Sequence, residues 1–287
     1  GTEVKSPLVS FRQTLRERGY VEGENLKLDE RWAEARFNRL PILASELVKL
    51  KPDIIVASGA SAVRAVMRET REIPIVIAGA SDPVAEGLVS SLSEPGANVT
   101  GISVLPGREL EGKRLEFLQR VIPGATRVAV ILDSTSRHDP TPLKSAADQL
   151  GITLIFSTET ESEEEFRGTF ADMVQRQADA VYAPETPVNA RQRRLIVELA
   201  LEHRLPAIFG SREYVEAGGL MSYGPNFSEL FERAALYTDR ILKGAIPGRL
   251  PIEQPMHLEL VINKKVAKQL HLSFPTMILM LADEVIQ

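Results

Sequence analysis

The sequence contains no cysteine and only one tryptophan, Trp32. Without cysteine, the chain forms no disulfide, binds no metal through a thiolate and carries no cysteine nucleophile. An excess of positive charge is also missing, since 34 Lys and Arg against 39 Asp and Glu give a formal net charge of −5. Nucleic acids and anionic membranes attract basic surfaces, so this balance argues against a nucleic-acid partner.

Long hydrophobic runs are absent as well. No apolar stretch approaches the roughly 20 residues that a transmembrane helix requires. Residues 1–5 contain no apolar segment of the kind that a signal peptide carries. The remaining composition is that of a globular protein, with 44% hydrophobic and 25% charged residues in a chain of 287. This length is sufficient for two domains of ordinary size.

Short β-branched runs alternate with longer amphipathic stretches along the chain. The spacing of apolar residues predicts helices over Leu40–Leu50 and Leu195–Ala200. Strands are predicted over the apolar runs at residues 54–57, 73–78, 127–132, 152–156 and 180–183. Strands that are apolar throughout are buried on both faces, as in a parallel sheet covered by helices. The predicted fold class is therefore α/β.

An internal repeat indicates how this α/β chain is divided. Residues 51–90 resemble residues 177–222, at an offset of 126–132 positions. Each passage contains a strand, a helix, a second strand and a loop with an acidic residue. A period this long that occurs only twice indicates two similar domains rather than a solenoid. We therefore predict two doubly wound, Rossmann-like lobes with a ligand cleft between them.

The predicted ligand site follows from the direction of the strands. In doubly wound sheets, ligands bind beyond the carboxyl ends of the strands, so the loops after matching strands are expected to form two facing walls. The first wall is predicted to contain Ser58, Gly59, Ala60, Ser61, Ala80, Ser81 and Asp82. The facing wall is predicted to contain Ser134, Glu185, Thr186, Ser211, Arg212 and Glu213, with Tyr223 as the aromatic residue nearest to the ligand.

The loop at residues 58–61 has two interpretations. It ends a strand and opens a helix, so its free N–H groups and serine hydroxyls suit a carboxylate or a phosphate. Alternatively, its serines only cap the helix. Asp82 precedes Pro83 and is either a helix N-cap or a ligand for an ammonium or hydroxyl group.

The remaining polar and aromatic candidates also have two interpretations each. Glu185 and Glu213 suit a cationic group, or they are caps and solvated charges. Arg212 either pairs with one of the acids at positions 82, 185 and 213 or clamps a carboxylate of the ligand. Trp32 and Tyr182 stand in or beside predicted strands, and we expect both in the core.

Motifs for catalysis are incomplete. Residues 107–114 have the glycine and lysine spacing of a phosphate-binding loop, but Arg114 replaces the Ser or Thr that would hold Mg²⁺. Residues 59–63 lack the closing glycine of a nucleophile elbow. None of the four histidines has a partner at metal-ligand spacing. We therefore predict a protein without catalytic residues, metal ion or cofactor.

A series of motifs resembles the substrate-binding proteins of ABC importers of the tryptophan/tyrosine type. In the first half of the chain, these motifs lie in residues 11–25, 31–41, 82–89, 95–101 and 113–116. In the second half, they lie in residues 218–224, 241–244, 250–255, 260–263 and 282–286. The resemblance therefore covers nearly the whole chain.

This resemblance implies a type I periplasmic-binding-protein fold with three crossover segments. The N-terminal lobe would contain residues 1–103 and 224–255, and the C-terminal lobe residues 104–223 and 256–287. It also implies that the protein is no enzyme but captures a small solute, such as an amino acid or an aromatic compound, by hinge closure. The expected partners are an ABC permease and its ATPase. The expected location is periplasmic or extracytoplasmic, with the signal sequence, and any lipid anchor, belonging to the full-length precursor.

Two other functions stay open at this point. The same two-lobe fold serves as the ligand-sensing domain of regulators, although no N-terminal helix-turn-helix precedes it here. An enzyme of doubly wound fold would need a nucleotide fingerprint or a base–nucleophile pair, which the sequence lacks. Family members usually begin with a strand that residues 2–10 do not contain, so we expect a strand edge to be exposed in the N-terminal sheet.

Overall fold

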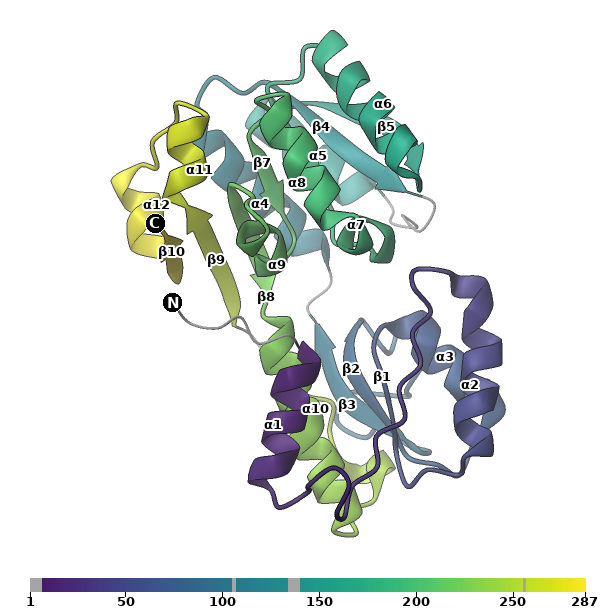
Figure 1. Ribbon diagram of the computed structural model, residues 1–287. Helices are drawn as coiled ribbons and strands as arrows, with labels where there is room; N and C mark the ends of the chain where they lie inside the picture. The colour runs from purple at the N-terminus through teal and green to yellow at the C-terminus, as the bar shows by residue number, and fades with distance from the viewer. Residues whose placement is uncertain (1–6, 105–106, 134–139, 255–256) are drawn as a thin grey trace. The chain divides into compact units, whose positions relative to one another are not determined.

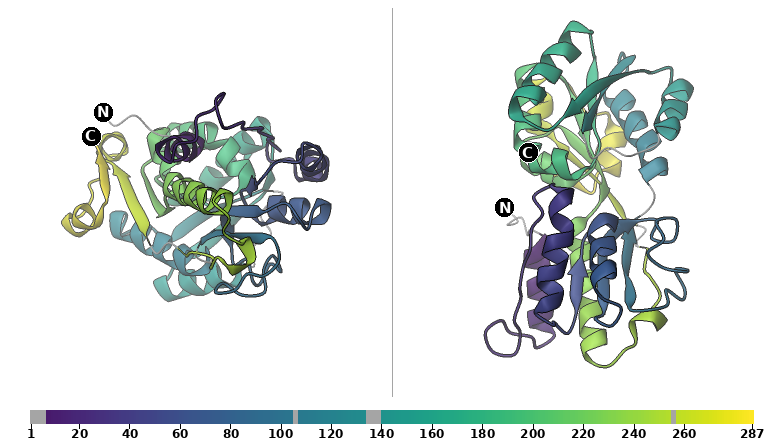
Figure 2. Two further views of the ribbon diagram at one scale, coloured as in Figure 1. Left: turned by 90° about the horizontal axis from the view of Figure 1, so that it is seen from below. Right: turned by 90° about the vertical axis from the view of Figure 1, so that its right-hand side faces the viewer.

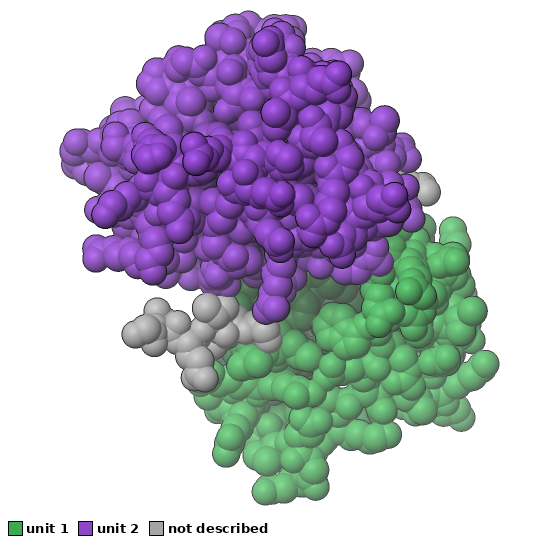
Figure 3. All heavy atoms as spheres, turned by 45° about the horizontal axis from the view of Figure 1, so that its top comes forward, with its two compact units in different colours: residues 1–106, 226–256 green, residues 107–225, 257–287 purple. Residues whose placement is uncertain are grey.

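The computed structural model describes residues 7–104, 107–133, 140–254 and 257–287. The chain divides into two compact units, which Figure 3 shows in different colours. The first unit contains residues 1–106 and 226–256, and the second contains residues 107–225 and 257–287. The chain therefore passes from one unit to the other three times.

The first unit is built on a parallel sheet in the order β1-β2-β3 (Figure 1). Its strands are β1 (Ile55–Ala57), β2 (Ile75–Ser81) and β3 (Val99–Val104). The segment around Glu253 runs beside β3, because Ser103 N donates to the Glu253 carbonyl and Glu253 N donates to the Gly101 carbonyl. In the part of the chain that the structure describes, β1 pairs with β2 alone, so no strand covers its other edge.

Helices cover both faces of this small sheet. They are α1 (Pro7–Glu17), α2 (Leu40–Lys49), α3 (Ala60–Glu69) and α10 (Phe227–Leu242), with 3-10 turns at Phe37–Arg39 and Pro247–Arg249. α2 packs on α3, and α1 lies along α10 (Figures 1 and 2). In β2, Ile75 and Ile77 belong to the core under α2 and α3, whereas Val76 and Ala78 belong to the core under α1 and α10. Burial on both faces explains why this strand is apolar throughout.

The second unit contains a larger sheet in the order β10-β9-β8-β7-β6-β4-β5. All neighbours are parallel except β8 and β9. The strands are β4 (Arg127–Asp133), β5 (Thr153–Thr160), β6 (Ala180–Ala183), β7 (Ala207–Phe209), β8 (Met221–Pro225), β9 (Leu258–Asn263) and β10 (Glu284–Ile286).

The helices of the second unit form two packed groups around the larger sheet. The helices are α4 (Gly107–Val121), α5 (Thr141–Leu150), α6 (Glu163–Gln175), α7 (Pro187–Arg191), α8 (Arg193–Glu202), α9 (Arg212–Glu216), α11 (Lys264–Gln269) and α12 (Thr276–Leu281). α4 packs on α5 and α12, and α8 packs on α6 and α9. Val128 and Val130 of β4 belong to the core with α4 and α5. Ala129 and Ile131, which alternate with them along the strand, are also fully buried.

The predicted α/β class is confirmed, and each predicted strand and helix is present with small shifts at its ends. Tyr182 is buried, as expected. The prediction for Trp32 is wrong, because its segment forms no strand and the side chain is 60% exposed, with Nε1 donating to Glu30. Within the described ranges, no helix combines the length and hydrophobicity needed to cross a bilayer.

Candidate functional site

In the first unit, the loops after β1 and β2 lie side by side at the carboxyl edge of the sheet, because the two strands are parallel. Gly59 N donates to the carbonyl of Gly79 in β2 at 3.0 Å and joins the loop after β1 to the neighbouring strand. The structure therefore brings together the predicted residues of the first wall, which are Ser58, Gly59, Ala60, Ser61, Ala80, Ser81 and Asp82.

The loop after β1 starts α3 without a side-chain cap. Gly59 is the N-cap residue, with a φ of 81° that strains any residue with a side chain. Ser58 and Ser61 are exposed, and neither hydroxyl bonds to another described residue. The interpretation of these serines as caps is therefore wrong. Their hydroxyls and the first N–H groups of α3 can donate hydrogen bonds to a bound anion.

Asp82 does not begin a helix, which corrects its interpretation as a helix N-cap. Residues 83–87 form turns, and Asp82 has a φ of 40°. Its Oδ1 accepts a hydrogen bond of 3.0 Å from Ala85 N and thereby caps a turn. Ser81 beside it is exposed, whereas Ala80 is buried within the strand.

In the second unit, the carboxyl ends of β4, β6 and β7 meet at one edge, because these strands are parallel neighbours. Glu185 and Thr186 follow β6, and residues 211–213 follow β7. The Ser211 side chain acts on the Glu185 carboxyl group as a hydrogen-bonding neighbour that lowers its pKa, so these two loops lie next to each other. Ser134, which follows β4, lies outside the described residues.

Thr186 is engaged within the protein. Its hydroxyl donates to the carboxylate of the fully buried Asp133 at the end of β4. The same oxygen accepts from Asn189 N at 3.1 Å, which makes Thr186 the N-cap of α7. The side chain therefore fixes the loop after β6 against the end of β4.

Glu185 has the environment of a functional carboxyl group. Burial and the negative charge of Glu213 raise the pKa of Glu185 to about 7. Oε2 of Glu185 and Oε2 of Glu213 are buried, and neither has a hydrogen-bond partner among the described residues. Unused carboxylate oxygens in a buried position favour a positively charged group with hydrogen-bond donors.

Arg212 is paired differently from the prediction. Its guanidinium contacts Glu216 at 2.8 Å, Glu259 at 2.9 Å and Glu284. The Glu259 side chain is only 6% exposed, so Arg212 compensates a buried negative charge. The expected pairing with Asp82, Glu185 or Glu213 is wrong, and these three contacts occupy the nitrogens that would clamp a carboxylate of the ligand.

Tyr223 lies in β8 with its ring packed inside the second unit. The ring meets Phe117 of α4 edge to face, with centroids 4.9 Å apart. The side chain is partly buried against the core that contains α4. Its role as the aromatic contact of the ligand stays a prediction.

Arg114 is a residue of this edge that the sequence interpretation missed. It is 5% exposed. Its guanidinium donates to the Tyr223 carbonyl at 2.7 Å, the Tyr182 hydroxyl at 3.0 Å and the Gly210 carbonyl at 3.4 Å. A signal was available, because Arg114 occupies an apolar-stripe position of α4 at helical spacing from buried Leu110, Leu118 and Val121. A charged residue in such a stripe indicates a buried polar function.

Two glycines allow the loop after β7 to approach β8 and the loop after β6 closely. A Cβ on Gly224 would lie 1.9 Å from the Gly210 carbonyl oxygen, and a Cβ on Gly210 would lie 2.7 Å from Cβ of Glu185. Neither position therefore accommodates a side chain. This close packing holds Glu185 against the loop that carries Ser211 and Glu213.

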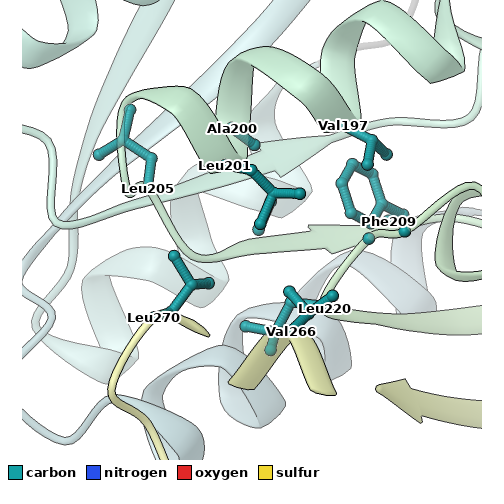
Figure 4. Close-up of a pocket in the computed structure, with 11 residues that line it drawn as sticks. Val197, Ala200, Leu201, Leu205, Phe209, Leu220, Val266 and Leu270 are labelled. Atoms are coloured by element: carbon teal, nitrogen blue, oxygen red, sulfur yellow. The ribbon is translucent and has the colours of Figure 1, made fainter. Parts of the chain in front are cut away.

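A pocket elsewhere in the second unit has no features of a solute site. It lies between α8, β7 and α11 and offers no polar side chain (Figure 4). Its lining consists of Val197, Ala200, Leu201, Leu205, Ala207, Phe209, Gly218, Gly219, Leu220, Val266 and Leu270. Ligand sites combine apolar walls with placed polar groups, so we interpret this pocket as a packing gap. Across the described residues, no three His, Asp or Glu side chains group as metal ligands.

The sequence profile described as ABC transporter substrate binding protein matches residues 8–286. The chain therefore belongs to this family, and the resemblance noted in the sequence is confirmed. Together with the two α/β units, likeness to solved structures identifies the fold as that of type I periplasmic binding proteins.

Named relatives are similar over most of their length. A tyrosine-binding protein of Clostridioides difficile (strain R20291) is 26% identical over 262 residues, which are 91% of this chain and 75% of that protein. The structure of an ABC domain in complex with L-Trp from Streptococcus pneumonia is 25% identical, with a TM-score of 0.85, and 96% and 93% of the two chains are covered. A conserved domain protein from Vibrio cholerae is 27% identical, with a TM-score of 0.85 and coverage of 97% and 95%.

Proposed function

We propose that this chain is the extracytoplasmic solute-binding component of an ABC importer and that its solute is an amino acid with an aromatic side chain. The family match over residues 8–286 carries the proposal. The solute class is supported by the relative named for tyrosine and by the similar structure in complex with L-Trp. The protein would bind and release its solute without a chemical step.

The two loop clusters match the polar groups of an amino acid. Exposed serine hydroxyls and helix N–H groups at residues 58–61 would bind the carboxylate. Ser81, the last residue of β2, and Asp82, which follows it, stand at the same edge of the sheet. Glu185 and Glu213 would accept hydrogen bonds from the ammonium group. This assignment uses one cluster from each unit.

Hinge closure would bring the two clusters to the same solute. The chain crosses between the units after residues 106, 225 and 256, and these crossings would form the hinge. A solute drives closure only through contacts that the open form does not make. The loaded protein would then deliver its solute to the permease and the ATPase.

Calorimetric titration with L-tryptophan, L-tyrosine and L-phenylalanine tests the proposed solute class. We expect saturable binding of at least one of them, and no binding of D-glucose as a neutral polar control. Mass spectrometry of the protein as purified provides an independent test, because a retained solute would be identified directly. Absence of binding to all three amino acids would refute the solute assignment and leave the family membership intact.

A further inference from the structure

Buried polar side chains with unused hydrogen-bonding capacity lie on the segments after β6 and β7, which also carry Glu185 and Glu213. Tyr214 and Asn189 are fully buried, yet the Tyr214 hydroxyl and the Asn189 Oδ1 have no hydrogen-bond partner in the described structure. The two carboxylates each have a buried Oε2 in the same condition. Buried polar groups in proteins are normally paired, so this cluster indicates a missing ligand with several donors.

The Tyr214 hydroxyl belongs to the same local environment. Burial and the negative charge of Glu185 raise the pKa of Tyr214 well above its ordinary value, and the charges of Asp133 and Glu213 act in the same direction. The phenol therefore stays neutral in the physiological range. The ring is held by stacking on Phe209, with centroids 4.7 Å apart.

Charged and titratable groups act on Glu185 or on the neighbouring Tyr214 from several elements. They are Glu213 and Tyr214 of α9, Arg114 of α4, Arg193 of α8, Tyr182 of β6 and Asp133 of β4. Arg114 donates to the Tyr223 and Gly210 carbonyls and to Tyr182, and Arg193 donates to the Ala190 carbonyl at 2.9 Å. Of the residues described, neither arginine forms an ion pair with Glu185. Burial and the negative charge of Glu213 therefore favour the protonated form of the Glu185 carboxyl group below a pH of about 7.

We propose that the ammonium group of the solute takes the place of a proton on Glu185, so that capture releases one proton and weakens as the solution becomes acidic. The inference rests on the proposed function, because it requires a solute with an ammonium group. The Glu185 carboxylic acid gives its proton to the solvent, and the resulting carboxylate accepts a hydrogen bond from the ammonium, which keeps its three protons. Glu213 disfavours a second negative charge in the empty site and becomes a second acceptor in the loaded site.

The size of the effect follows from proton linkage. With the pKa of Glu185 at about 7, the affinity is nearly constant above this pH. Below it, each pH unit lowers the affinity by about tenfold, because binding must first expel the proton. From pH 8 to pH 5 the expected loss is therefore on the order of a hundredfold.

The test is calorimetric titration of the full chain with L-tryptophan and L-tyrosine at several pH values between 5 and 8. Repeating the titration at pH 6 in buffers of different ionisation enthalpy counts the protons released, and we expect nearly one per solute. Glu185→Gln should abolish both the release and the pH slope and lower the affinity at pH 8. The matched control Glu164→Gln alters an exposed acid of the same unit and should retain the unaltered profile.

A second variant keeps the test informative if Glu185→Gln folds poorly. Glu213→Gln removes the neighbouring charge that raises the Glu185 pKa, so the loss of affinity should begin at a lower pH. Indole-3-propionate, which lacks the ammonium group, should bind weakly and release no proton. Binding that is independent of pH, or a pH slope that persists in Glu185→Gln, would overturn the proton-linked capture but not the proposed solute class. Failure of every amino acid to bind at any pH would overturn both the proton-linked capture and the proposed solute class.

Discussion

Nε of Arg114 in α4 donates a hydrogen bond of 2.7 Å to the carbonyl oxygen of Tyr223 in β8, 109 positions further along the chain. The other guanidinium nitrogens donate to the Tyr182 hydroxyl and the Gly210 carbonyl. One side chain thus joins β6, the end of β7 and β8. A guanidinium suits this task, because it presents five donors in a rigid plane.

Replacing this guanidinium should destabilise the second unit. Arg114→Met keeps much of the side-chain volume but leaves two carbonyls and a hydroxyl in a buried position without their donor. We expect the free energy of unfolding to fall by about 3 kcal/mol, measured by urea denaturation. The control Arg120→Met removes a partly exposed ion pair with Glu116 on the same helix and should cost less than about 1 kcal/mol. Equal small losses in both variants would contradict the role of Arg114 as a central hydrogen-bond donor.

The close approach of β8 to the loop after β7 at Gly224 leads to a second prediction. A Cβ at this position would lie 1.9 Å from the Gly210 carbonyl oxygen, so Gly224→Ala must displace backbone. We expect a loss of about 3 kcal/mol or more, seen as a lower denaturation midpoint. Gly168→Ala is the matched control, because its Cβ meets open space inside α6, and it should stabilise the protein by about 0.5–1 kcal/mol. An unchanged stability in Gly224→Ala would contradict this close approach of β8 to Gly210.

The pKa of Glu185 predicts how stability depends on pH in the absence of solute. The folded-state pKa is about 7 against an ordinary value of 4.5, so the folded protein keeps a proton that the unfolded chain has lost. This contribution to stability is complete below pH 4.5 and is lost as the pH rises through 7. Over this pH range, the free energy of unfolding of the unaltered protein should fall by about 3 kcal/mol. Glu185→Gln should not show this fall. Denaturation of both proteins at several pH values measures this difference, and a constant difference would contradict the raised pKa.

The strands were predictable because burial on both faces removes polar residues from them, as in β2 and β6. The loops of the candidate site were predictable for a related reason, since parallel order alone places their starting points at one edge. Contacts between distant side chains were not predictable in this way. Of the three acids that hold Arg212, only Glu216 stands at a helical spacing from it, whereas Glu259 and Glu284 come from strands much further along the chain.

The ion pairs of Arg212 predict a structural role for this residue. Arg212→Gln removes the arginine that contacts the buried Glu259 carboxylate, so we expect the free energy of unfolding to fall by about 3 kcal/mol. The affinity for L-tryptophan should stay within about twofold, because the guanidinium is already occupied by protein carboxylates. Arg167→Gln, which removes exposed ion pairs of α6, serves as the control and should change neither quantity. Loss of affinity without loss of stability would instead favour the ligand clamp.

The serines before and within the first turn of α3 predict the opposite pattern. Ser58 and Ser61 are exposed and have no hydrogen-bond partner among the described residues, so replacing both by Ala should leave the free energy of unfolding unchanged. If their hydroxyls bind the carboxylate of the solute, the affinity for L-tryptophan should fall about tenfold. Tryptamine lacks the carboxylate, and its weaker binding should be equal in the unaltered and double-variant proteins. Ser93→Ala, an exposed serine of the same unit, controls for the loss of a hydroxyl. An equal loss for both compounds would show that the serines shape the loop rather than bind the carboxylate.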